Sequence, residues 1–195
     1  MLDKQKQLLI LIAGNGGQGI SLMSNVLAYA GFSENLEVKI VPQIFSKSQT
    51  DERVYTIGFS NESDFPFFSS QFDIIVLCSR EQVERFPVYT NLLKKDTGLC
   101  IYNSSLINNL GREQACLFPT DIPTIGVDAS KIALSAGNIK VFNMVMLGAL
   151  TSVMKIISDN SVIESIKQNL PSIPRKFLSL NLSAYYKGRK PGNRE

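Results

Sequence analysis

The sequence predicts an α/β fold of three layers, α/β/α, with a Rossmann-like, mostly parallel sheet in a single domain whose C-terminal third is helical. Three observations support this prediction. Apolar runs at residues 8–13 and 72–78, the second with Asp73 near its start, are typical of strands buried on both faces of a parallel sheet. A glycine-rich loop joins the first run to an amphipathic segment, and strand-like and helix-like segments then alternate. A chain of 195 residues is long enough for one such domain.

The strands are expected where apolar runs are bounded by turn residues. After the first run, strands are expected at residues 38–41, 53–60, 72–78, 97–102, 114–118 and 124–127, with an exposed polar loop at 43–52. The connection at residues 61–70 contains Phe65, Phe67 and Phe68, which either enter the core or form a patch for a partner.

The helices are expected from helical periodicity, caps and breakers. They are placed at residues 20–31, at 79–95 with an interruption near Pro87, at 129–135, at 139–158, from 160 onward, and at 174–187. Gly137 is a plausible end for the third of these. The helix at 139–158 is apolar nearly all round, which indicates burial between the sheet and other helices or a neighbouring subunit.

The glycine-rich loop, GNGGQG, has the spacing G-x-G-x-x-G between a strand and a helix. Glycines permit positive φ and leave no Cβ between the backbone and a ligand, so amides at the helix start can face an anion. Gly14, Gly16, Gly17, Gln18 and Gly19 are therefore candidate binding residues. Two interpretations stay open: a phosphate or other anion binds the loop, or the glycines serve only close packing of helix and sheet.

An intact dinucleotide is disfavoured by the residues after the second strand. Such sites place an acidic residue there, about 20 residues beyond the glycines, to hold a ribose hydroxyl. The strand at residues 38–41 is followed by Pro42, Gln43 and Ile44, none of which is acidic. Another polar group follows a later strand, where Asn103, Ser104 and Ser105 form either part of a site or a local polar turn.

Composition argues against several functional classes. The chain has no histidine, which removes Ser-His-Asp and Cys-His nucleophiles and imidazole metal ligation. Cys78, Cys100 and Cys116 include no C-x-x-C pair, so no metal or iron–sulfur site is predicted. An odd number of cysteines without a signal peptide predicts a reducing compartment and hence the cytoplasm.

Charge and hydropathy limit the partners. The net charge of +3 is too small to indicate nucleic-acid binding. The longest uncharged stretch, at residues 141–154, has the length of a core helix and not of a membrane span. Residues 189–195 are basic and are expected to form a flexible tail.

Three segments carry a family resemblance: IAGNGGQGI at residues 12–20, GNIKVFNMVMLGAL at 137–150, and IPRKFLSLNLSAYYKG at 173–188. In order and spacing they resemble the gamma subunit, or gamma domain, of the 2-oxoacid:ferredoxin oxidoreductases of pyruvate, 2-oxoglutarate or 2-ketoisovalerate type. This family includes the beta subunit of indolepyruvate oxidoreductase, and the third segment favours that branch. The resemblance implies one gamma-type domain at residues 1–188.

The resemblance implies a non-redox subunit of a complex that oxidatively decarboxylates 2-oxo acids to acyl-CoA. Thiamine diphosphate and iron–sulfur clusters would reside on thiamine-binding and ferredoxin-like partner subunits, and this chain would support the thiamine-binding units and help to admit or hold CoA. No catalytic residue is assigned to it. Matching the motif position by position adds Asn143 to the candidate cofactor-binding residues. The other interpretation of Asn143 is structural, with its side chain bound to a nearby backbone amide.

One departure from the family pattern favours alternatives. Family members commonly carry Arg-Gly-Gly before the third strand, where this chain has Gln49, Thr50 and Asp51, flanked by Lys47 and Arg53 as substitute cations. The chain would then be a divergent paralogue. The alternative hypotheses are a free-standing Rossmann-like nucleotide- or anion-binding protein, and a homodimer that uses the buried helix in place of the lost partner.

Overall fold

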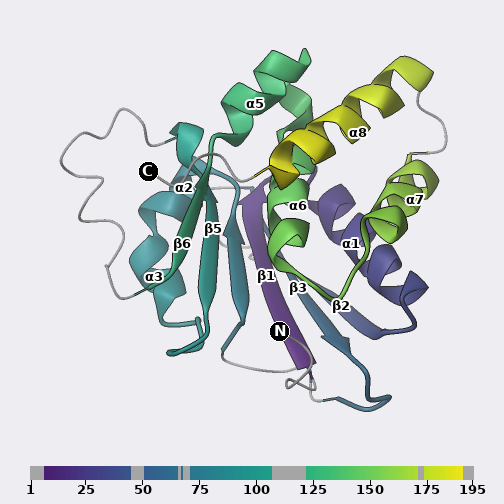
Figure 1. Ribbon diagram of the computed structural model, residues 1–195. Helices are drawn as coiled ribbons and strands as arrows, with labels where there is room; N and C mark the ends of the chain where they lie inside the picture. The colour runs from purple at the N-terminus through teal and green to yellow at the C-terminus, as the bar shows by residue number, and fades with distance from the viewer. Residues whose placement is uncertain are drawn as a thin grey trace.

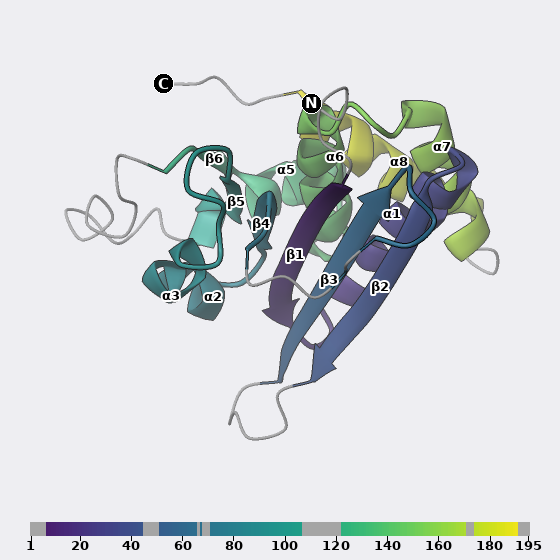
Figure 2. The ribbon, with the colours of Figure 1, turned by 90° about the horizontal axis from the view of Figure 1, so that it is seen from below.

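The computed structural model describes residues 7–44, 51–65, 67, 71–106, 122–170 and 174–190. It is a six-stranded sheet in the order β2-β3-β1-β4-β5-β6, with helices on both faces (Figures 1 and 2). The strands are β1 (Gln7–Asn15), β2 (Glu37–Ile44), β3 (Glu52–Ser60), β4 (Ile74–Leu77), β5 (Leu99–Asn103) and β6 (Thr124–Val127). The predicted α/β architecture is confirmed, while the strand expected at 114–118 lies outside the described residues.

The direction of β3 determines what lies beside the glycine loop. Strands β1, β4, β5 and β6 pair in parallel, so their carboxyl ends share one edge of the sheet. β3 is antiparallel to both β1 and β2, and its first residue, Glu52, pairs with Asn15 at the end of β1. The sequence predicted a strand at residues 53–60, but not its antiparallel direction or its place between β1 and β2. Because of this arrangement, the residues just before β3 lie against the loop that follows β1.

Helices cover the two faces of the sheet unequally. One face carries α1 (Ile20–Ser33), α5 (Ala129–Ala136), α6 (Phe142–Val153), α7 (Asp159–Asn169) and α8 (Arg175–Arg189). The other face carries the short helices α2 (Arg80–Glu84) and α3 (Phe86–Thr90), over the β4–β6 half of the sheet in Figure 2. In β1, Ile10 and Ile12 pack toward the first face, and Leu9 and Leu11 toward the second. Burial on both faces explains the unbroken apolar run.

Several element boundaries differ from the sequence-based expectation. The helix expected at 139–158 begins with a 3-10 turn, η3 (Ile139–Val141), and continues as α6. α6 ends at Val153 because Met154 is extended. A 3-10 turn, η1 (Ser104–Leu106), also follows β5. The helix expected at 79–95 is broken into α2 and α3 near Pro87. Phe65 and Phe67 are buried, which favours the core interpretation for both; Phe68 lies outside the described residues.

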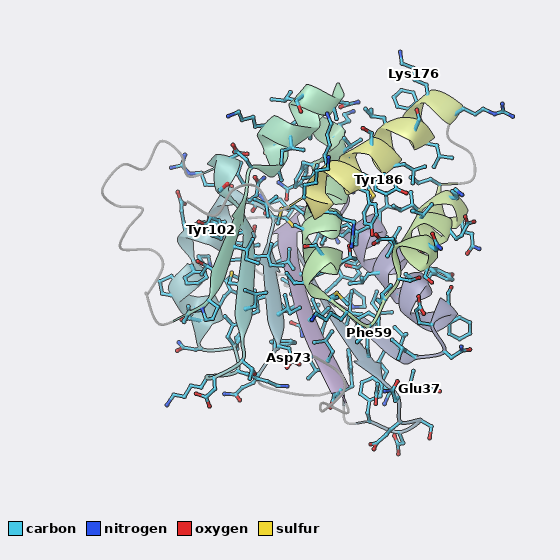
Figure 3. The ribbon with its side chains drawn as sticks, viewed as in Figure 1. Glu37, Phe59, Asp73, Tyr102, Lys176 and Tyr186 are labelled. Atoms are coloured by element: carbon cyan, nitrogen blue, oxygen red, sulfur yellow. The ribbon has the colours of Figure 1, made fainter. Side chains whose placement is uncertain are left out.

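The C-terminal helix α8 crosses α6 at a contact between two glycines. A Cβ on Gly148 would overlap the carbonyl oxygen of Tyr185, and a Cβ on Gly188 would overlap the carbonyl oxygen of Val145. Arg189, one residue beyond the predicted domain limit, belongs to α8 and pairs with Asp159 at 2.6 Å. The tail residues 191–195 lie outside the described part of the chain. Figure 3 places Lys176 at the outer end of α8, away from the sheet.

Among the described residues, none of the helices combines the length and the apolarity needed to cross a lipid bilayer.

Candidate functional site

The glycine loop connects β1 to α1 and is held in shape by its own side chains and backbone. Gly17 and Gly19 have φ of 76° and 73°, in the left-handed region that favours glycine. The Gln18 side-chain oxygen accepts a hydrogen bond from the Asn15 amide at 2.7 Å, and the Gln18 amide donates to the Asn15 carbonyl at 3.2 Å. The loop is thus a closed turn of fixed conformation.

The spaces left by three of the four glycines are filled by other groups. A Cβ on Gly14 would come within 2.6 Å of the Ile20 side chain, so this glycine serves packing of α1 on the sheet. A Cβ on Gly19 would overlap the Asn143 side-chain amide, and one on Gly16 would overlap the Asp51 carboxylate. At Gly17 nothing lies within 4 Å. Gly14 and Gly19 therefore support the packing interpretation of the motif.

Asn143, in the first turn of α6, connects the glycine loop to the buried helix. Its side-chain nitrogen donates to the carbonyl oxygen of Gly19 at 3.2 Å, so the structure pairs it with a carbonyl where the sequence suggested a backbone amide. The residue is 3% exposed, and its side-chain oxygen has no hydrogen-bond partner. A buried acceptor without a partner is uncommon in folded proteins. It is the one atom among these six candidate residues that points to a missing ligand.

A second polar cluster lies at the same edge of the sheet, beyond β5 and β6. The Ser105 hydroxyl donates to Asp128 at 2.7 Å and accepts from the Ser130 amide at 3.2 Å, at the start of α5. Asn103 donates to the Ser130 hydroxyl at 3.0 Å, while its own side-chain oxygen is buried without a partner. The Asn103–Ser105 segment therefore forms the local polar turn. Its contribution to a site stays a prediction.

A buried carboxylate, missed from the sequence, lies under the glycine loop. Residues 43–52 were expected to form an exposed loop, yet Gln43 and Ile44 belong to β2, and Glu52 is only 6% exposed. Tyr89 donates to Glu52 at 2.8 Å and Arg85 at 3.1 Å. Burial, together with the hydrogen bond to Glu52, raises the pKa of Tyr89. A buried charge is unfavourable unless it is paired, so the hydrogen bonds from these two partners make the burial of the Glu52 carboxylate possible.

The same network reaches the last residue of β1. Gln82 donates both to Glu52, at 3.3 Å, and to the Asn15 side chain, at 3.2 Å. Asn15 in turn donates to Glu81 at 2.9 Å. The pKa of Glu81 is lowered by its own backbone amide, then by the Ser79 hydroxyl, and also by Asn15. The network fixes the position from which the glycine loop departs. A glutamate directly before an apolar strand was the only signal in the sequence.

Asp51, one of the three residues that the resemblance aligns with Arg-Gly-Gly, contacts the glycine loop. The carbonyl oxygen of Asp51 accepts a hydrogen bond from the Gly16 amide at 2.7 Å. Its carboxylate pairs with Arg53 at 2.8 Å. Arg53, one of the two substitute cations suggested by the sequence, is therefore already paired, and Lys47 lies outside the described residues.

The two described cysteines behave as buried apolar groups. Cys78 and Cys100 are fully buried. Burial raises the pKa of Cys78 to about 12 and also raises that of Cys100, so neither thiol ionises near neutral pH. Within the described ranges, no three histidine, cysteine or acidic side chains are grouped so as to hold a metal ion.

An open hollow of about 450 Å³ lies away from the glycine loop. Its walls come from the end of α6, the start of α7 and the end of α8, with Thr151, Asp159 and Arg189 among the lining residues. These three are already linked to one another, because Arg189 contacts both Thr151 and Asp159. None of the six candidate residues lines the hollow.

Comparison with known proteins gives matches over nearly the whole chain. The indolepyruvate oxidoreductase subunit IorB of Thermococcus kodakarensis is 29% identical, over 95% of this chain and 96% of the relative. Pyruvate synthase subunit PorC of Methanothermobacter thermautotrophicus is 28% identical, over 81% of this chain and 82% of the relative.

Solved structures share the fold. The gamma subunit of the keto/oxoacid ferredoxin oxidoreductase of Geobacter sulfurreducens has a TM-score of 0.74 at 20% identity, and the match covers 93% of this chain and 95% of that one. The 2-oxoglutarate:ferredoxin oxidoreductase of Magnetococcus marinus has a TM-score of 0.80 at 23% identity, over 95% of this chain but only 31% of that longer chain.

The model of the family described as pyruvate ferredoxin/flavodoxin oxidoreductase matches residues 9–190. The chain therefore belongs to the pyruvate ferredoxin/flavodoxin oxidoreductase family.

Proposed function

We propose that this chain is the gamma-type, non-redox subunit of a 2-oxoacid:ferredoxin oxidoreductase complex and has no catalytic activity alone. The observation that carries the proposal is the near full-length match to chains that are themselves named as subunits, of indolepyruvate, pyruvate and 2-oxoglutarate enzymes. The chain's own chemistry agrees, because it has no histidine and no C-x-x-C pair. Thiamine diphosphate and the iron–sulfur clusters belong, in this proposal, to thiamine-binding and ferredoxin-like partners in the cytoplasm.

The finer part of the proposal is that the glycine loop faces CoA. The solved Magnetococcus marinus enzyme contains 2-oxoglutarate, coenzyme A and succinyl-CoA. CoA offers phosphates for backbone amides and amide N–H groups for an unpaired acceptor. The open part of the loop at Gly17, where nothing lies within 4 Å of a Cβ, would receive a phosphate, and the buried oxygen of Asn143 is the unpaired acceptor. When bound, CoA would supply the thiol that accepts the acyl group on the partner chain.

Co-purification tests the subunit role. The chain is co-expressed with a thiamine-binding chain encoded beside it, and the mass of the product is measured by native mass spectrometry. We expect a stable complex that contains both chains. If the chain stays alone, as a monomer or as the homodimer considered above, the subunit role is refuted.

CoA binding is tested with an Asn143→Leu variant of the assembled complex. Leucine has a similar size but no acceptor, so we expect the KM for CoA to rise about tenfold or more, as for the loss of one buried hydrogen bond, while the KM for the 2-oxo acid is unchanged. Equal kinetic constants for the variant and the wild type would contradict a role of Asn143 in CoA binding.

The alternative function, a free-standing nucleotide- or anion-binding protein, is favoured by one observation. Asp51 contacts the glycine loop directly, with its carboxylate over Gly16 and its carbonyl oxygen bonded to the Gly16 amide. Calorimetry of the lone chain with NADP, adenine nucleotides and CoA separates the two functions. Tight binding of a dinucleotide by the lone chain, without association with a thiamine-binding chain, would favour the alternative.

A further inference from the structure

An acidic side chain lies directly over the glycine loop. The carboxylate of Asp51 takes the space that a Cβ on Gly16 would occupy. In a G-x-G-x-x-G loop the second glycine, here Gly16, is the position at which a pyrophosphate approaches the backbone. The carboxylate therefore stands where the negative group of a ligand would come nearest, and it repels such a group.

An independent observation points to a ligand at the same loop. Asn143, whose side-chain nitrogen binds the Gly19 carbonyl, has a buried side-chain oxygen with no hydrogen-bond partner. Burying an acceptor without a hydrogen bond is unfavourable. A side chain that holds the loop thus carries an acceptor that the protein itself leaves unused, and the protein itself fills the anion position at Gly16.

The contact of Asp51 with the loop is easily broken. Its carboxylate is held by Arg53 at 2.8 Å, and the side chains of Asp51 and Arg53 are 66% and 44% exposed. Exposed ion pairs contribute little to stability, because water solvates both partners well when they separate. The Gly16 amide is held by the backbone carbonyl of Asp51, so the carboxylate can turn outward while the loop stays in place.

We propose that Asp51 is a displaceable occupant of the anion position and determines how tightly the loop binds phosphate-bearing ligands. A phosphate reaches Gly16 only after the Asp51 carboxylate turns away, and Arg53 then pairs with that phosphate. This inference rests on the proposed function in assigning a phosphate-bearing ligand to the loop. It adds that the Asp51 carboxylate weakens the binding without abolishing it.

The test is calorimetric titration of the full chain with coenzyme A and with inorganic pyrophosphate. We compare the wild type with Asp51→Asn and Asp51→Gly, and we expect both variants to bind at least about tenfold more tightly, because a like charge in contact with the anion is removed. Arg53→Ala in the Asp51→Asn background loses this gain. Asp64→Asn is the matched control, since Asp64 is an exposed acid paired with Lys39 near the opposite end of β3.

Three results would overturn the inference: unchanged affinity in the Asp51 variants, an equal gain in the Asp64 control, or no binding of either anion by any variant. Thermal unfolding checks that every variant is folded. Assembly with a thiamine-binding chain tests the proposed function, and titration of the lone chain tests this inference, so each can fail without the other.

Discussion

Replacing Gly19 by alanine tests whether the glycine loop and the buried helix form one packed unit. Gly19 has φ of 73°, and an L-residue there costs about 1–2 kcal/mol. The new Cβ would also overlap the side-chain amide of Asn143, so Asn143 must move and lose its hydrogen bond to the Gly19 carbonyl. Overpacking costs about 1–3 kcal/mol. We expect Gly19→Ala to lower the free energy of unfolding by about 2–5 kcal/mol.

A double-mutant cycle separates the two contributions. In an Asn143→Ala background the overlap is gone, and only the backbone cost of about 1–2 kcal/mol is left for alanine at position 19. The two substitutions are therefore coupled by about 1–3 kcal/mol. The free energies come from urea unfolding of the four proteins, followed by circular dichroism.

Gly17 is the matched control. Its φ is 76°, but nothing lies within 4 Å of a Cβ there, so Gly17→Ala carries the backbone cost alone. We expect no coupling between position 17 and Asn143. If the Gly19 cycle is additive to within about 0.5 kcal/mol, or if Gly17 and Gly19 respond alike, the packing argument is refuted.

Three further substitutions address the core and the network beneath the loop. Gly148→Ala forces the backbones of α6 and α8 apart, so we expect a loss of about 3 kcal/mol or more in urea unfolding. Glu52→Ala removes the buried centre of the network and should cost about 3 kcal/mol. In a Cys116→Ser variant at pH 8, we expect Cys78 and Cys100 to react with a thiol reagent only after denaturation, because burial keeps both protonated.

Each of these expectations has a clear contradiction. An unchanged urea midpoint of unfolding for Gly148→Ala would mean that α8 does not cross α6 as described. A loss from Glu52→Ala no larger than that from Glu84→Ala, an exposed glutamate on α2 with its own ion pair, would mean that Glu52 is not buried. Rapid labelling of native Cys116→Ser would show that the described cysteines are accessible.

Local patterns predicted those parts of the fold that local chemistry determines. The apolar run of β1, the glycine turn after it and the end of α5 at Gly137 could be predicted. Burial on both faces of the sheet requires apolar residues, and a left-handed backbone favours glycine. Gly137 has φ of 111°, which explains its place at the helix end.

The rest depended on contacts between segments far apart in the sequence. The insertion of β3 between β1 and β2 is decided by pairing across the sheet, and that pairing places Asp51 beside Gly16 and Glu52 beside Asn15. Glu52 can be buried because Tyr89 and Arg85, from the helical layer, donate hydrogen bonds to its carboxylate. For the site, the motif identified the loop and Asn143, but the groups that fill the glycine spaces required the structure.

The most direct test of the central claim is reconstitution of activity from separate chains. Reduction of a viologen dye is measured with a 2-oxo acid and CoA, using the companion thiamine-binding and iron–sulfur chains with and without this chain. Our account predicts no dye reduction by this chain alone and a CoA-dependent rate with the companions that rises as this chain is added. Turnover by the isolated chain, or a rate from the companions that does not change on its addition, would contradict the account.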